Sequence, residues 1–449
     1  MELKLRNIKG TKDYMPEEQY VRNEIRKKVE SVFECYGYLP LETPILCYYD
    51  MLASKYAGGS EILKEVYKLK DQGERDLGFR YDLTIPFAKV IGLNPNIRMP
   101  FKRYEIGKVF RDGPVKLGRN REFIQCDVDM VGVKSMLAEA ELISMVFEVF
   151  DKLQLEVYVS YNNRKLLSGI ISDSKVGDKM INEVILTVDK IEKIGTLGVK
   201  QELRDKGLSE AVINSLFESM QSAKSDLQAY IDNHLSNQLI SEGGIELNEL
   251  NSYFEALGII AQVRFNPFLS RGLDIYTSTV FEAFLFDGSI ASSVAGGGRY
   301  DNIIGSFLDN GKDYPAVGIS FGLDVIFAAL TLKNKIQYKY PLDLMIIPLG
   351  TESKAIEIAK VLRQKGFLVD IEMTGRKLKK CLDFVNKEKI PYALILGQNE
   401  LVTNCAKLKS MFTGVEKTIL ISSIAAELKT VDQREYENVK DLDRICGIH

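Results

Sequence analysis

The chain has 449 residues, of which 45% are hydrophobic and 27% are charged, and its net charge is −3. The length predicts two or three domains, and no apolar run approaches the roughly 20 residues of a membrane-spanning helix, so we expect a soluble protein without a membrane span. The small net charge excludes a broad polycation that binds nucleic acid indiscriminately, but it permits local basic patches that contact a structured RNA.

The numbers and spacing of cysteine and histidine residues exclude several kinds of metal site and catalytic group. The six cysteines show no CxxC spacing, which argues against a zinc site and against a disulfide framework. Only two histidines occur, His234 and His449, so a catalytic histidine base and a histidine-ligated zinc are close to excluded. Residues 1–6 lack the apolar stretch and cleavage site of a secretory signal, so we expect a cytoplasmic location.

The first predicted element is an amphipathic helix over residues 17–34, with Pro16 before it and Gly37 after it. Its apolar residues recur at helical spacing; they are Val21, Ile25, Val29, Val32 and Phe33. Residues 38–45 contain two prolines and are predicted to be extended, because a proline disfavours helical geometry in the residue before it.

A sheet and a helical segment are predicted next. We expect strands over residues 104–110, 123–131 and 155–161, joined by loops and not by regularly spaced helices, which indicates a mixed or antiparallel sheet. Residues 165–255 carry long polar and apolar stretches at helical spacing and are predicted to form a helical insertion.

The pattern changes again from Pro341, where predicted strands and helices alternate. The predicted strands cover 344–348, 367–371 and 392–396, and the two helices between them end at Gly366 and near residue 387. This βαβαβ alternation predicts a parallel sheet with right-handed crossovers in a separate domain.

Two segments concentrate functional side chains. Residues 295–301 read AGGGRYD, and their glycines would let the backbone approach a ligand closely. This segment matches neither of the common phosphate-binding glycine patterns, and a bulge or a tight turn explains it as well. Residues 270–282 read SRGLDIYTSTVFE and bring charged, hydroxyl and aromatic groups into one short stretch that we expect to be extended.

The second segment resembles the signature peptide of histidine–tRNA ligases, RGLDYYT-x-T-V-F-E, and AGGGRYD resembles the next motif of that family at the expected distance. Other segments agree in order. They are GTKD at 10–13, YGY and TPI within 36–45, which resemble the dimer-forming motif 1 of class II synthetases, and RYDLTIPF at 80–87.

The resemblance implies a fold and a division into domains. It implies an α+β class II synthetase catalytic domain, an antiparallel sheet flanked by helices, over residues 1–330, with the helical insertion at 165–255 inside it. It also implies an α/β anticodon-binding domain over 340–430 and a C-terminal tail at 431–449. Motif 1 implies a homodimer.

The implied function is ATP-dependent activation of L-histidine to histidyl-adenylate, followed by transfer to the 3′ end of tRNA(His). The family holds the amino group of histidine with the loop that contains Asp82 and Thr84, which suits a carboxylate and a hydroxyl. An aspartate in such a place is, by itself, more often a turn residue. Further residues would give the imidazole nitrogens partners that an apolar isostere could not satisfy; they are Gln125, Asp129, Tyr276 and Tyr300.

Residues 108–129 resemble motif 2. Activation places negative charge on phosphate oxygens, which fixed guanidinium groups stabilise, and the predicted catalytic residues are Arg111 and Arg271. The resemblance implies that Arg111 contacts the α-phosphate, that Arg271 lies opposite it, and that Arg119 and Phe123 also bind ATP, with Phe123 stacked on adenine. Without the flanking matches, an arginine–carboxylate pair on neighbouring strands is usually a solvated contact. Mg²⁺ is expected with ATP, and no metal ligand is assigned.

A basic run opens the second predicted helix of the C-terminal module. It resembles a stretch of the family's anticodon-binding domain, and its implied tRNA-binding residues are Arg376, Lys377, Lys379 and Lys380. Such a run by itself is usually a solvated face. For the transfer step, our hypothesis is that the ribose hydroxyl attacks the mixed anhydride without a histidine base and that the adenylate phosphate takes the proton.

The chain departs from the family pattern at several positions. Residues 315–326, PAVGISFGLDVI, resemble motif 3 of the family, and Val325 stands where the family has an arginine that packs on ATP. Ile275, Asn120 and Gly113 replace a tyrosine, a tyrosine and a glutamate. An alternative function is therefore a histidine-binding regulatory paralogue that does not charge tRNA, similar to the regulatory subunit of ATP phosphoribosyltransferase. The anticodon-like module argues against it, and a pure RNA-binding scaffold would not need the small-molecule residues.

Overall fold

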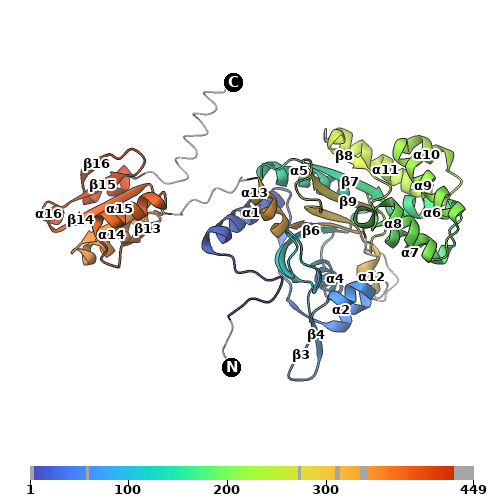
Figure 1. Ribbon diagram of the computed structural model, residues 1–449, viewed down its shortest axis with the longest axis horizontal. Helices are drawn as coiled ribbons and strands as arrows, with labels where there is room; N and C mark the ends of the chain where they lie inside the picture. The colour runs from blue at the N-terminus through green and yellow to red at the C-terminus, as the bar shows by residue number, and fades with distance from the viewer. Residues whose placement is uncertain (1–4, 57–59, 272–274, 309–313, 334–341, 429–449) are drawn as a thin grey trace. The chain divides into compact units, whose positions relative to one another are not determined.

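The computed structural model describes residues 5–56, 60–271, 275–308, 314–333 and 342–428. The chain divides into two compact units, Met1–Ile336 and Gln337–His449 (Figure 1). Each unit has hydrophobic clusters of its own. Across the described ranges, every helix is too short or too polar to cross a membrane.

An eight-stranded sheet organises the first unit, in the order β1-β5-β6-β11-β10-β9-β7-β8. Its strands are β1 (Leu39–Pro40), β5 (Phe101–Phe110), β6 (Glu122–Val131), β7 (Val157–Asn163), β8 (Val263–Phe265), β9 (Thr279–Leu285), β10 (Ala295–Arg299) and β11 (Ala316–Gly322). The pairs β1–β5 and β7–β8 are parallel and the other pairs are antiparallel. The predicted mixed sheet is confirmed.

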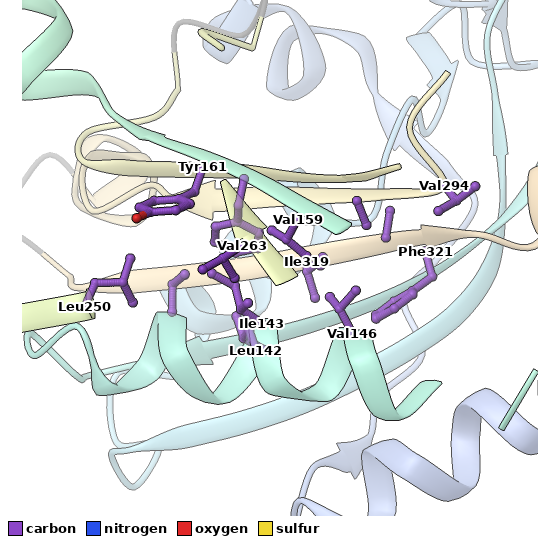
Figure 2. Packing of buried hydrophobic residues seen from close by; sticks show 14 of the residues in the cluster. Leu142, Ile143, Val146, Val159, Tyr161, Leu250, Val263, Val294, Ile319 and Phe321 are labelled. Carbon is purple, nitrogen blue, oxygen red and sulfur yellow. The ribbon is translucent and has the colours of Figure 1, made fainter. Parts of the chain in front are cut away.

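One face of this sheet is apolar and packs against helices α1 (Pro16–Cys35), α5 (Leu137–Lys152) and α13 (Leu323–Leu332). Figure 2 shows Leu142, Ile143 and Val146 of α5 directed at Ile319 and Phe321 of the sheet. Successive strand residues point to opposite faces, so the residues that alternate with this apolar set face the other side. That other side carries the polar residues described below.

A smaller three-stranded sheet, in the order β2-β4-β3, lies between β1 and β5 in sequence and was not predicted. It consists of β2 (Leu46–Tyr48), β4 (Asp76–Phe79) and β3 (Lys68–Lys70), and the helices beside it in the chain are α2 (Tyr49–Tyr56), α3 (Ser60–Glu65) and α4 (Thr84–Leu93). Helix α4 packs against α12 (Asn302–Leu308). This packing joins the chain near residue 84 to the chain after β10.

The elements between β7 and β8 are helical, as predicted for the insertion (Figure 1). They are α6 (Arg164–Asp173), η1 (Asp178–Met180), α7 (Ile181–Val188), α8 (Ile191–Asp205), α9 (Glu210–Ser225), α10 (Leu227–Asn233), α11 (Gln238–Ala256) and η2 (Ile260–Gln262). Side chains of Asn163, Ser209, Asp226 and Asn237 accept hydrogen bonds from the first N–H groups of four of these helices, which fixes where each helix begins.

The second unit contains the predicted βαβαβ arrangement, with β12 (Leu344–Leu349), α14 (Glu352–Gln364), β13 (Val369–Ile371), α15 (Leu378–Lys387) and β14 (Tyr392–Gly397). Strand β12 pairs in parallel with both β13 and β14, as expected. The remaining elements were not predicted; they are α16 (Gln398–Val402), the antiparallel strands β15 (Cys405–Ser410) and β16 (Glu416–Leu420), η3 (Ile421–Ser423) and α17 (Ile424–Glu427).

One local prediction is wrong. Residues 270, 271 and 275–278 are not part of a strand, and β9 begins only at Thr279. Arg271 has a φ of +49°, a left-handed conformation that an extended stretch does not contain. Residues 272–274 of the same motif lie outside the described residues.

Candidate active site

Polar side chains gather on the sheet face opposite the core. On β6, Cys126 and Val128 belong to the apolar core, so the alternating residues Gln125, Asp127 and Asp129 face the other side. All three are nearly buried, with 9%, 3% and 2% of their surface exposed. Of these three, Gln125 and Asp129 were predicted from the sequence and Asp127 was not.

Three glycines let side chains from other segments lie across this face. A Cβ atom at Gly318 would fall 1.9 Å from Oδ1 of Asp129, and one at Gly296 would fall 2.0 Å from Nη1 of Arg271. At Gly298 it would meet the ring of Tyr276 at 2.7 Å. Gly296 and Gly298 lie within strand β10, so the AGGGRYD segment serves close approach and not a tight turn.

The buried Arg80 holds the loop that leads to α4. Its guanidinium donates to Glu105 at 2.7 Å and to the backbone oxygens of Thr43 at 2.7 Å and Lys108 at 2.8 Å. Two residues further on, Asp82 accepts a hydrogen bond from the backbone N–H of Ile85 at 3.0 Å. This bond places the Asp82 carboxylate at the N-terminus of α4, and the half-buried Thr84 begins the helix.

Asp129 is held by two strong partners. Arg103 lies 2.7 Å from its Oδ2 and is fully buried, while the hydroxyl of Tyr300 donates to its Oδ1. Burial raises the pKa of Asp129, and Arg103 and the Tyr300 hydroxyl oppose this rise. Burial together with Asp129 also raises the pKa of Tyr300 well above its ordinary value, so Tyr300 stays a neutral donor.

Gln125 and Asp127 are less completely paired. Gln125 donates to the hydroxyl of Ser320 at 2.7 Å, and Ser320 is the cross-strand neighbour of Asp127. Among the described residues, no donor reaches Gln125 Oε1 or Asp127 Oδ1. Burial and the nearby charge of Asp129 raise the pKa of Asp127 to about 8.

Tyr276 lies within range of the charges of Asp82 and Asp127. Burial raises its pKa, Arg271 lowers it, and the charges of Glu282, Asp82 and Asp127 raise it again. Tyr276 and Ile275 also line a pocket of about 440 Å³ that the sequence did not reveal; its other lining residues are Arg164, Ser168, Asn182, Thr277, Asn302, Ile303 and Ser306.

The two predicted catalytic arginines come from different strands and loops. Arg111 follows β5, its guanidinium lies 4.1 Å from the ring centre of Tyr81 and 5.2 Å from that of Phe123, and its Nε donates to the backbone oxygen of Tyr81 at 3.1 Å. Arg271 lies over Gly296, 3.6 Å from the carboxylate of Glu282. Arg119 is exposed in the tight turn between β5 and β6.

Val325 lies beneath this turn, where a Cβ atom at Gly118 would fall 2.9 Å from its Cα. The residue before it, Asp324, accepts hydrogen bonds from Arg22 at 2.7 Å and from the backbone N–H of Ile124 at 2.9 Å. A buried guanidinium is therefore present near this position, but it comes from α1. Asn120 donates to the hydroxyl of Tyr14 at 3.4 Å, in the same network.

The predicted tRNA-binding residues lie in the second unit, apart in the chain from the catalytic residues. Arg376 pairs with Glu372 at 3.1 Å, and Lys377 precedes the first residue of α15. Lys379 and Lys380 lie in its first turn, and all four basic residues are exposed. Among the described residues, His, Cys, Asp and Glu form no group of three that could hold a metal ion by themselves.

The mostly antiparallel sheet with its arginines, acidic residues and glycines, together with a separate βαβαβ unit, defines a class II aminoacyl-tRNA synthetase. The family model described as histidyl-tRNA synthetase matches residues 10–326, and an anticodon-binding domain model matches residues 343–431. The chain belongs to the histidyl-tRNA synthetase family.

Individual relatives agree with this assignment. The chain is 53% identical to histidine–tRNA ligase 1 of Bacillus thuringiensis subsp. konkukian over 94% of this chain and 99% of that protein. It is 49% identical to histidine–tRNA ligase 2 of Shouchella clausii over 93% and 98%. The crystal structure of histidyl-tRNA synthetase from Nostoc sp. PCC 7120 superposes with a TM-score of 0.80 at 26% identity and covers 95% of this chain and 99% of that one.

Proposed function

We propose that this chain activates L-histidine with ATP to form histidyl-adenylate and then transfers the histidyl group to the 3′ end of tRNA(His). The observation that carries the proposal is the buried set of Asp129, Arg103 and Tyr300 beside Gln125 on the polar sheet face. Oriented carboxylate, amide and hydroxyl groups in a buried pocket suit a small polar ring with nitrogen atoms, and they reject an apolar isostere.

The amino-acid substrate binds by both of its ends. Asp82 pairs with the ammonium group and Thr84 accepts a hydrogen bond from it, which the position of Asp82 at the start of α4 supports. The imidazole lies against Gln125, Asp129, Tyr276 and Tyr300, the polar groups that the glycines of β10 and β11 allow to converge.

ATP binds beside Arg111, Arg119 and Phe123, with adenine on the Phe123 ring and the α-phosphate near Arg111. Arg111 and Arg271 stabilise the charge that develops on the phosphate oxygens when the histidine carboxylate attacks the α-phosphorus. Mg²⁺ brought by ATP would be held mainly by the phosphates and water, together with one or two carboxylates such as Glu282, and it would neutralise phosphate charge.

The second unit binds tRNA through Arg376, Lys377, Lys379 and Lys380, whose exposed charges at the start of α15 suit phosphate contacts. We further propose a cytoplasmic homodimer, a catalytic domain over 1–330 that includes the insertion at 165–255, an anticodon-binding domain over 340–430 and a tail over 431–449. In the transfer step, the adenylate phosphate accepts the proton of the attacking ribose hydroxyl.

Histidine-dependent exchange of pyrophosphate into ATP, followed by charging of tRNA(His), tests the proposal. We expect exchange with L-histidine and not with other amino acids, and charging of tRNA(His) alone. Arg111→Ala is expected to lower the exchange rate by about 100-fold or more, as for removal of one transition-state donor. Histidine binding without exchange would contradict the proposal and favour the regulatory alternative.

A further inference from the structure

Asp127 is a buried carboxyl group that no part of the proposed mechanism uses. It is 3% exposed, and within the described parts of the chain its Oδ1 has no hydrogen-bond partner. Burying a polar oxygen without a partner is unfavourable by about 1–3 kcal/mol, and more for a charged group. A fold that retains such a group at a ligand-binding face often does so because the ligand supplies the partner.

The neighbouring carboxylates are already paired. Glu105, directly across the strand pair from Asp127, accepts from Arg80 at 2.7 Å and from the hydroxyl of Thr43 at 2.9 Å. Asp129 is held by Arg103 on one oxygen and by Tyr300 on the other. Of these three carboxyl groups, Asp127 therefore has the oxygen with the fewest protein partners.

We propose that Asp127 is a further specificity-determining residue, whose Oδ1 forms a hydrogen bond with an imidazole nitrogen of the bound histidine. This inference rests on the proposed function and adds a residue to its substrate pocket. Asp127 stands between Gln125 and Asp129 on the same strand face. A ring that reaches both of these residues must pass beside Asp127.

The protonation of Asp127 suits a ring nitrogen. Its pKa of about 8 in the empty site lies above that of free imidazole, about 6.5, so between these values the carboxyl carries a proton and the imidazole is neutral. The carboxyl then shares its proton with the unprotonated ring nitrogen, and no proton enters or leaves the solvent. An apolar side chain leaves this oxygen without a partner.

The charge around Asp127 comes from several elements, and each contributes to its protonation. The titratable or charged groups that face it are Glu105 and Arg103 of β5, Asp129 of β6, Asp82 before α4, Arg271 and Tyr276 before β9, and Tyr300 after β10. Any pH dependence of histidine binding must therefore be assigned by comparing variants at Asp127 itself.

The test measures the KM values for L-histidine and for ATP in pyrophosphate exchange, in the full chain and in Asp127→Asn and Asp127→Ala. We expect the histidine KM to rise by about tenfold or more, because one buried hydrogen bond is lost and its partner is left unsatisfied, while the ATP KM changes by less than about twofold. The matched control is Asp343→Asn, another buried aspartate with an unpaired oxygen, in the second unit. It should change neither KM.

A pH profile of histidine binding separates this role from a structural one. In the wild type, affinity should fall above about pH 8 with uptake of a proton, and Asp127→Asn should keep only the part of this fall that comes from the substrate's own ammonium group. If Asp127→Asn fails to fold, proton uptake by the wild type, measured by calorimetry in two buffers, still tests the inference.

An unchanged histidine KM in a folded Asp127→Ala protein would overturn the inference, and so would equal rises of both KM values. Absence of proton uptake by the wild type above pH 8 would also overturn it. If the wild type shows no histidine-dependent exchange at all, the proposed function fails first. The two failures are therefore distinguishable.

Discussion

His234 lies at the end of α10 in the helical insertion, where its ring stacks on Tyr230 with 4.1 Å between ring centres. Its Nδ1 lies 2.7 Å from the backbone oxygen of Tyr230. These contacts give His234 a structural role at the end of a helix. The polar sheet face instead carries carboxylates, arginines and tyrosines. The only other histidine, His449, lies outside the described residues.

The transfer hypothesis gives a residue-scale prediction. The double variant His234→Gln/His449→Gln should transfer histidine from the adenylate to tRNA(His) at the wild-type rate in a single-turnover assay, because neither ring supplies the base. Circular dichroism controls for loss of the α10 contact. A fall in the transfer rate of about tenfold or more in a folded variant would show that a histidine takes part in the chemistry.

Sequence patterns pointed to some residues of the candidate site and missed others. Arg111 and Arg271 stand out because charged residues inside recognisable motifs carry the resemblance. Asp127 does not, because an aspartate that alternates with apolar residues is normal for a strand with one solvated face. This face is buried because side chains from distant segments, such as Arg271 and Tyr276, lie across it, and contacts between distant segments are not encoded in local periodicity.

At the scale of elements, periodicity predicted α1 and the first three strands of the second unit to within a few residues, because each buries a continuous apolar stripe. It missed β2, β3 and β4, which have three or four residues each and largely exposed faces. It also misjudged residues 270, 271 and 275–278, where β-branched and aromatic residues favour a strand, but Arg271 has a left-handed backbone and the strand begins only at Thr279.

The contact of α1 with α13 depends on a buried ion pair. Arg22 and Asp324 are 4% and 3% exposed at their side chains and lie 2.7 Å apart, and the Arg22 guanidinium stacks on Tyr14 at 3.7 Å. Removing one partner leaves an uncompensated buried charge. Since Asp324 also accepts a hydrogen bond from the N–H of Ile124, the pair holds the start of β6, where Phe123 lies.

Breaking this pair gives an element-scale prediction. Arg22→Met should lower the free energy of unfolding of the first unit by about 3–5 kcal/mol, measured by urea denaturation, and should raise the KM for ATP more than that for histidine. The control is Lys27→Met on the same helix, whose pair with Glu24 is exposed and should contribute less than about 1 kcal/mol. Equal effects of the two variants would contradict the role given to Arg22.

At the scale of the whole molecule, the chain has two units, and the proposed activation chemistry and the proposed binding of the tRNA anticodon region fall in different units. The residues proposed to carry the chemistry lie in the first unit, and the basic start of α15 lies in the second. Each unit has hydrophobic clusters of its own, so charge changes on the second unit should leave the chemistry of the first intact.

This separation predicts the effect of charge reversal in α15. Lys379→Glu/Lys380→Glu should leave histidine-dependent pyrophosphate exchange unchanged and raise the KM for tRNA(His) by about tenfold or more, with a weaker dependence on salt, since phosphate contacts are lost. The matched control is Lys360→Glu/Lys365→Glu, which changes two exposed lysines at α14. If both pairs of changes raise the KM equally, the effect is general repulsion and not a binding surface.

The strand order also has a consequence for how the protein is made. Strand β6 takes β11 as its second neighbour, and residues 132–315, the whole helical insertion among them, are synthesised between the two. At a translation rate of roughly 5–20 residues per second, about 10–40 seconds pass between the synthesis of β6 and that of its partner β11. During that time the nascent chain has an unpaired strand edge beside an incomplete core, so we expect chaperones that bind such edges to protect it until β11 emerges.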